Sequence, residues 1–205
     1  MKKAEKNNQT RLQAPMGETT VLLHTCCAPC SSAIIEAMMK NGITPVIYYC
    51  NPNIYPREEY EIRKNECTRY AESLGLEIVD ADYDHENWLE AMKGLEDEPE
   101  RGGRCLRCFR LRLLRTARYA AERGIRVITT TLASSRWKSL DQINEAGLWA
   151  CEMVSSSSEA AVPTPIYWTQ NWRKGGLQER RLQIIKEYDF YNQLYCGCEF
   201  SMRKD

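Results

Sequence analysis

Short apolar runs alternate with longer amphipathic segments along most of the chain, and this alternation constrains the fold most strongly. Runs rich in β-branched and aromatic residues predict strands at 21–25, 43–49, 76–83 and 126–132. Helical patterns lie at 31–42, 57–75, 84–93, 105–124, 139–153 and 178–193. Strand–helix alternation is typical of βαβ units around a parallel sheet. We therefore expect an α/β fold with a Rossmann-type core.

Three polar motifs follow three of the predicted strands. CCAPC follows the first strand, NPN the second and TLASSRWK the fourth. Parallel sheets bind their ligands beyond the carboxyl ends of the strands, near a switch in strand order. The sequence therefore predicts a functional site at this edge of the sheet.

The chain of 205 residues is long enough for one domain with a substantial core. We expect the polar segment 1–18 to be a disordered extension, and 19–202 to form a single domain whose irregular and helical part, from about 152, covers the site. The N-terminal segment lacks the apolar core of a signal peptide, and no later segment is long and apolar enough to cross a membrane. We expect a cytoplasmic protein with no membrane partner.

Ten cysteines are many for a cytoplasmic chain of this size, and they favour metal binding or redox chemistry because disulfides seldom persist there. Seven fall into three groups: Cys26, Cys27 and Cys30; Cys105 and Cys108; Cys196 and Cys198. One zinc ion or one iron–sulfur cluster takes four thiolates, so three thiols are left over. Adjacent side chains point apart in a regular backbone, so the CC and CGC pairs are expected to divide their thiols between two neighbouring metal centres.

The other cysteines and His24 have simpler interpretations. Cys67 and Cys151 fall in the middle of predicted helices and are expected to be small buried hydrophobes. Cys50 ends the second strand, close to the predicted site. His24 lies in the first strand and is expected to be a hydrogen-bonded core residue.

The residues alone leave two other functions open. One is a zinc-binding module that binds nucleic acid, in which three thiols would have no role. The other is a thiol–disulfide oxidoreductase that uses the CLRC motif, in which only Cys105 and Cys108 would matter. The net charge is zero, with 28 basic and 28 acidic residues, which argues against broad binding of polyanions but allows a local basic face.

Five longer motifs bring these groups together. They are HTCCAPC (24–30), YYCNPNIYPREEYEIR (48–63), GLEDEPERGGRCLRCFRLRL (94–113), TLASSRWK (131–138) and YCGCEFS (195–201). Over about residues 19 to 202 the chain resembles the QueH-type epoxyqueuosine reductases. It departs from their pattern where Cys50 interrupts YYNPN, where Arg136 replaces a proline, and where PIYWTQNWRKGG carries tryptophans in place of an Asp-Phe pair.

The resemblance implies a cobalamin-independent enzyme that removes the epoxide oxygen of epoxyqueuosine at the wobble position of tRNA, which is the last step of queuosine biosynthesis. It implies an adenine-nucleotide α-hydrolase-like (HUP) core, a 4Fe–4S cluster and a nearby mononuclear iron. We assign the cluster to Cys27, Cys105, Cys108 and Cys196. The second iron, which meets the epoxide, is assigned to Cys26, Cys30 and Cys198 as the catalytic group. Electrons would come from an unidentified low-potential donor of the ferredoxin or flavodoxin type.

Several polar residues are candidates for contact with the tRNA substrate. Tyr49, Asn51 and Asn53 either line the nucleoside pocket or form a simple Asn-Pro turn. Glu59 and Arg63 are four residues apart on one predicted helix, and the alternative for them is a surface ion pair of little energetic value.

A second set of candidates lies further along the chain. Ser135 and Lys138 are candidates for the anticodon backbone, although Ser135 could instead begin the following helix. Trp172, Arg173 and Lys174 combine a ring for base stacking with charges for phosphates, a pattern suited to the anticodon loop. The alternative for Trp172 is that it fills the core.

Overall fold

A parallel sheet forms the centre of the molecule, for which a computed structural model describes residues 12–157 and 163–202. Across these residues the sheet has five strands: β1 (Thr20–Thr25), β2 (Thr44–Tyr49), β3 (Ile78–Asp80), β4 (Val127–Thr130) and β5 (Ile166–Tyr167). The strand order is β3-β2-β1-β4-β5, and every pairing is parallel. This confirms the expected α/β fold with a Rossmann-like core.

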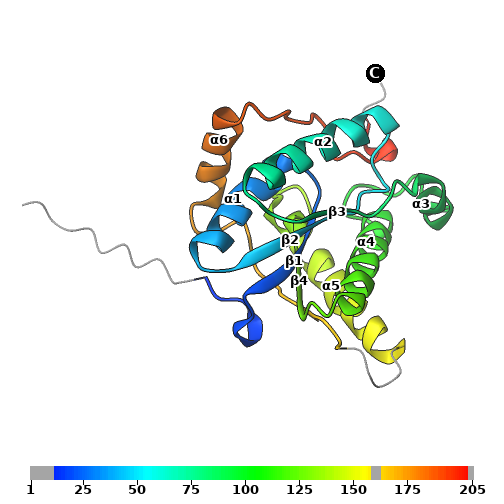
Figure 1. The fold of residues 1–205 in the computed structure, drawn as a ribbon. Coiled ribbons are helices and arrows are strands. Elements are labelled where there is room, and N and C mark those ends of the chain that lie inside the picture. The colour runs from blue at the N-terminus through cyan, green and yellow to red at the C-terminus, as the bar shows by residue number, and fades with distance from the viewer. Residues whose placement is uncertain (1–11, 158–162, 203–205) are drawn as a thin grey trace, which may run out of the picture.

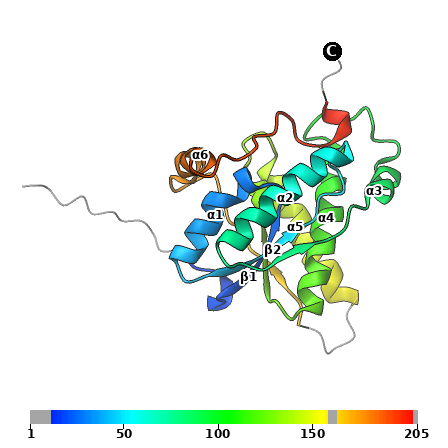
Figure 2. The same ribbon diagram turned by 45° about the horizontal axis from the view of Figure 1, so that its top comes forward.

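Helices cover both faces of the sheet (Figures 1 and 2). They are α1 (Ala28–Lys40), α2 (Arg57–Ser73), α3 (His85–Met92), α4 (Gly103–Glu122), α5 (Leu140–Ser157) and α6 (Leu177–Glu187). Helices α1 and α2 pack on one face and α4 and α5 on the other, while α6 lies against α1 and α3 against α4. The described residues also form three short 3₁₀ helices: η1 (Pro15–Gly17), η2 (Thr131–Ser134) and η3 (Glu199–Ser201).

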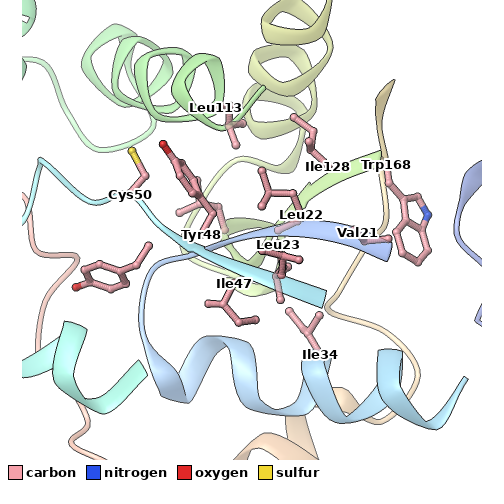
Figure 3. Packing of buried hydrophobic residues seen from close by; sticks show 14 of the residues in the cluster. Val21, Leu22, Leu23, Ile34, Ile47, Tyr48, Cys50, Leu113, Ile128 and Trp168 are labelled. Atoms are coloured by element: carbon pink, nitrogen blue, oxygen red, sulfur yellow. The ribbon is translucent and has the colours of Figure 1, made fainter. Parts of the chain in front are cut away.

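The core explains why the central strands read as unbroken apolar runs. Leu22 of β1 points toward α4 and α5, where it meets Leu113, whereas Leu23 points to the opposite face beside Ile47 and Ile34 (Figure 3). Successive side chains of a strand face opposite sides, so a strand that is covered on both faces needs apolar residues at every position.

The C-terminal part of the last predicted helix is an error of the sequence analysis. The helical pattern predicted 178–193, but α6 ends at Glu187 and Asp189 adopts a φ of +50°. Tyr188 and Phe190 pack edge-on against Tyr70 of α2, with ring centroids 5.0 and 5.1 Å away. Packing of these two rings against Tyr70 therefore ends the helix and directs the chain along α2. The sequence analysis also missed β5, because a strand of only two residues carries no periodic signal.

The segments at both ends of the described chain are tied to the fold. Residues 1–11 of the predicted extension lie outside the described residues, but Ala14 belongs to the core and the Leu12 backbone N–H donates to Asn41 Oδ1 at 3.1 Å. The segment after α6 passes α2 and ends near α3, at the carboxyl edge of the sheet (Figure 1). Among the described residues, no helix is both long enough and apolar enough to span a membrane.

Candidate active site

A cavity of about 1280 Å³ lies at the carboxyl edge of the sheet. Six of the seven grouped cysteines line it: Cys26, Cys30, Cys105, Cys108, Cys196 and Cys198. Strand β1 lies between β2 and β4. From β1 the chain continues to β2 on one side and returns only later to β4 on the other side, so the strand order reverses at β1. The cavity is therefore at the topological switch point, where α/β sheets bind ligands.

The first three thiols form one compact group. The Sγ atoms of Cys26 and Cys27 are 3.9 Å apart, and all three Sγ atoms, including that of Cys30, lie within 4.8 Å of one another. Cys27 is the extended N-cap of α1, with φ −172° and ψ 159°, so the backbone there is not regular. The expectation that the adjacent side chains point apart is therefore wrong. Two thiolates on one tetrahedral ion are about 3.8 Å apart when each metal–sulfur bond is about 2.3 Å, which matches this pair.

The other four thiols come from two distant segments. Cys105 and Cys108 lie in the first two turns of α4, and Cys196 and Cys198 lie in the segment after α6. Gly197 between them has φ +104°, and a Cβ added there would be 2.9 Å from Ile54 and 3.0 Å from Arg63. Only glycine fits this turn without a shift of its neighbours.

A buried ion pair holds the CGC segment in place. Arg63 and Glu59 form a salt bridge of 2.6 Å with exposed fractions of only 3% and 8%. Arg63 also donates to the carbonyls of Tyr195 and Cys196, at 3.3 Å each, and the Tyr191 hydroxyl donates to Glu59 at 2.8 Å. The pair is therefore buried and is not a surface ion pair, and of the two residues only Arg63 lines the cavity. It anchors the segment that carries the last two cysteines.

Two cations at the cavity lower or limit the pKa values of the thiols. Burial raises the pKa of Cys105 and raises that of Cys27 well above its usual range. Burial alone would also raise the pKa of Cys196, but the charge of Lys138, whose Nζ donates to Cys196 Sγ at 2.9 Å, lowers it. The buried Arg112 guanidinium adds a second positive charge beside the site. Burial favours the neutral thiol, and the fixed positive charges on the cavity wall favour the thiolate instead.

His24 and three cysteines belong to the core. His24 contacts Thr130 Oγ1 at 2.7 Å through Nδ1 and the Cys50 carbonyl at 3.0 Å through Nε2, and a carbonyl only accepts, so Nε2 carries the proton. Burial lowers the pKa of His24 to about 3, so the ring is neutral near pH 7. Cys50, Cys67 and Cys151 are buried and absent from the cavity wall, which agrees with the core roles expected for His24, Cys67 and Cys151.

The structure separates the three candidates of the NPN turn. Tyr49 is buried in the core, where its hydroxyl donates to the Tyr60 carbonyl at 3.2 Å, so the pocket role predicted for it is wrong. Asn51 lines the cavity, but its amide already donates to the Thr25 carbonyl at 2.9 Å and accepts from Arg112. Asn53 lines the cavity and is 2% exposed, and its Oδ1 has no hydrogen-bond partner among the described residues.

The candidates further along the chain also divide. Ser135, Lys138 and Arg173 line the cavity, whereas the exposed Lys174 does not. Trp172 is 1% exposed, and its Nε1 donates to Thr129 Oγ1 at 3.3 Å, so the stacking role predicted for it is wrong and the ring fills the core. Ser135 accepts the Trp137 N–H at 3.3 Å within a turn, five residues before α5 begins.

The sequence analysis identified only part of the basic wall of the cavity. Eight basic residues and a single acidic one, Glu100, line it within the described chain. The basic residues are Arg63, Arg101, Arg104, Arg112, Arg136, Lys138, Arg173 and Arg181. The whole chain has zero net charge, so the excess of positive charge is specific to this cavity. The RGG and SRWK stretches carried the signal, but only the fold shows that they meet.

Comparison with known proteins gives a consistent result. The family model described as "Epoxyqueuosine reductase QueH" matches residues 21–204. Proteins of the same name from Histophilus somni and Haemophilus influenzae are 47% and 46% identical, over 98% and 94% of this chain and 82% and 76% of their own lengths. The protein of that name from Thermotoga maritima is 33% identical over 89% of this chain and 90% of its own.

Proposed function

The chain belongs to the QueH family of epoxyqueuosine reductases, and from this premise we propose that it reduces epoxyqueuosine at the wobble position of tRNA to queuosine. Removal of the epoxide oxygen as water consumes two electrons and two protons. The observation that carries the proposal is the gathering of seven thiols at one cavity with a basic wall. A zinc module would leave three of these thiols without a role, and a CxxC oxidoreductase would need only Cys105 and Cys108.

The donor set fits iron. Thiolates are the ligands of iron–sulfur clusters, and every grouped thiol is either on the cavity wall or, for Cys27, within 4.8 Å of two that are. We assign a 4Fe–4S cluster to the quartet of Cys105, Cys108, Cys196 and Cys198. A mononuclear iron is assigned to the triad of Cys26, Cys27 and Cys30. When bound, the cluster would supply electrons and the iron would act as a Lewis acid toward the epoxide oxygen.

This assignment differs from the division proposed on sequence grounds. That division placed Cys27 with the cluster and Cys198 with the second iron, because adjacent thiols were expected to diverge. The 3.9 Å between the Cys26 and Cys27 Sγ atoms supports keeping these two together. The four thiols of the quartet come from the start of α4 and from the CGC segment, and all of them line the same cavity, which supports placing them together.

The chain's own residues prepare the site in three ways. Lys138 and Arg112 place positive charge beside the thiols, which favours the thiolate form that binds metal. Gln193 donates to Cys27 Sγ at 3.0 Å and so orients a second thiol. The Glu59–Arg63 pair fixes the backbone of the CGC segment. The unpartnered Asn53 Oδ1 is a polar group available to the substrate nucleoside.

A direct assay tests the function. Anaerobically purified protein with a low-potential chemical reductant should convert epoxyqueuosine to queuosine in tRNA, measured by mass spectrometry of the digested nucleosides. Ferredoxin or flavodoxin should replace the chemical reductant. Iron-loaded protein that leaves epoxyqueuosine intact would contradict the proposal. A colourless protein after iron and sulfide reconstitution would favour the zinc module.

Two neighbouring cations give a matched test of tRNA contact. Arg173 lines the cavity and Lys174 does not, although they are adjacent and both basic. Arg173→Ala should weaken tRNA binding and reduce the slope of log affinity against log salt by roughly one unit, because one phosphate contact is lost. Lys174→Ala should change the slope much less. Filter binding over a salt series measures both variants, and equal slopes for the two would place the RNA elsewhere on the surface.

A further inference from the structure

Trp137 is an exposed aromatic residue on the wall of the cavity. Its side chain is 68% exposed, although the residue lines the same cavity as the cysteines. Because removal of a large aromatic ring from water is favourable, an exposed ring at a site is typical of a surface that a ligand covers. We propose that Trp137 stacks on the nucleobase next to the modified nucleoside in the anticodon loop of tRNA. The proposal rests on the function proposed above.

The backbone around Trp137 is held by the neighbouring loop. Arg101 donates through Nε to the Trp137 carbonyl at 2.9 Å and through its terminal nitrogen to the Arg136 carbonyl at 3.1 Å. Gln142 of α5 donates in turn to the Arg101 carbonyl at 2.8 Å. The turn before α5 is therefore tied to the loop before α4. The indole projects from a fixed backbone, which reduces the entropy that binding would cost.

The position of Trp137 places it beside a neighbour of the modified nucleoside. The next residue, Lys138, places its Nζ 2.9 Å from the Cys196 thiol. A nucleoside that reaches the cysteines therefore lies beside Lys138, and the base that follows or precedes it along the RNA strand lies beside Trp137. When the modified base turns out of the anticodon loop into the cavity, the adjacent base loses a stacking partner. The Trp137 ring replaces that partner and so favours entry of the modified base.

Charge around the ring matches an RNA strand. The Arg136 guanidinium lies 5.2 Å from the indole centroid, and Arg101 and Arg136 are both exposed. Recognition of single-stranded RNA combines an aromatic ring, which stacks on a base, with cations, which follow the backbone. Elsewhere on the surface, Trp149 of α5 lies 5.1 Å from the Arg110 guanidinium but is partly buried and absent from the cavity wall. This second Arg–Trp pair is a matched control.

A double-mutant cycle between protein and RNA tests the contact. The anaerobic holoenzyme is titrated with an anticodon stem-loop that carries epoxyqueuosine, and with two versions in which the nucleotide on either side of it is abasic. Trp137→Ala should weaken binding of the intact stem-loop by about 5-fold to 150-fold, the range measured for loss of base stacking on an aromatic ring. Trp137→Phe should retain most of the affinity, and Trp149→Ala should bind like the wild type.

The abasic stem-loops identify the partner base. At one of the two positions, the abasic stem-loop should bind the wild-type protein more weakly, by a factor similar to the effect of Trp137→Ala. The same abasic stem-loop should lower the affinity of the Trp137→Ala protein little further, because the stacking contact is already absent. Losses that multiply independently at both positions would overturn the stacking contact. So would unchanged RNA affinity of Trp137→Ala with slower turnover on a protein electron donor, which would assign the ring to that partner. If the wild type does not convert epoxyqueuosine at all, the proposed function fails, and the stacking proposal fails with it.

Discussion

Cys30→Ala is expected to reduce conversion of epoxyqueuosine by at least about 100-fold while most of the visible absorption of the protein remains. Cys30 belongs to the compact triad with Cys26 and Cys27, whose Sγ atoms lie within 4.8 Å of one another. Under the proposed assignment, its loss removes a ligand from the mononuclear iron, whereas the four ligands assigned to the cluster come from α4 and the CGC segment. Iron content should fall by about one atom per chain.

Nucleoside analysis of digested tRNA and an absorption spectrum of the same preparation measure both effects. Cys151→Ala is the control, because Cys151, like Cys30, lies in a helix but is buried in α5, away from the cavity. It should keep both iron and activity. Wild-type turnover in Cys30→Ala would contradict a reacting metal at the triad, and loss of all visible absorption would show that Cys30 holds the cluster.

Cys105→Ser is expected to remove most of the visible absorption and the activity together. Anaerobic wild-type protein should contain more iron than the four atoms of one cluster, and the variant should lose most of that cluster iron. The physical reason is that Cys105 lies in the first turn of α4, one turn from Cys108. Under the proposed assignment these two thiols supply half of the cluster ligands. Unchanged iron and absorption in Cys105→Ser would refute the cluster assignment.

The same measurements on Cys27→Ala and Cys198→Ala distinguish the two divisions of the thiols. If the triad and the quartet bind separate centres, Cys27→Ala keeps the cluster absorption and Cys198→Ala loses it. The division based on sequence requires the reverse. Cys67→Ala, in α2, is a control for loss of a buried thiol outside both groups.

The periodic pattern was sufficient to predict four of the five strands of the described sheet, because these four are apolar runs in the local sequence. Four apolar runs became strands, and the motifs that follow them meet at the carboxyl edge, as parallel topology requires. The direction of the Cys26 and Cys27 side chains was beyond such an analysis. Cys27 is an N-cap with extended backbone, and alternation rules apply only to regular structure.

The burial of individual residues could not be predicted from the sequence either. The sequence contains RWK at 136–138 and WRK at 172–174, which are equivalent in composition. The ring of Trp172 is in the core and that of Trp137 is in solvent, because the first packs against Trp168 next to β5 while the second lies in a turn. Likewise, an i, i+4 Glu–Arg pair is usually a surface feature, and the aromatic segment that buries Glu59 and Arg63 is more than 120 residues away in sequence.

The contribution of thiols from three distant segments has a consequence for biosynthesis. During translation the sheet residues are complete at Tyr167, before Cys196 leaves the ribosome, so a nascent chain carries five of the seven thiols with no CGC segment to complete the quartet. Arg63 and Glu59 are already in place to receive that segment when it arrives. Under the proposed assignment, insertion of the cluster therefore follows docking of this segment, whereas the triad is complete early. Until the segment docks, the five early thiols are open to thiophilic metals such as zinc or copper.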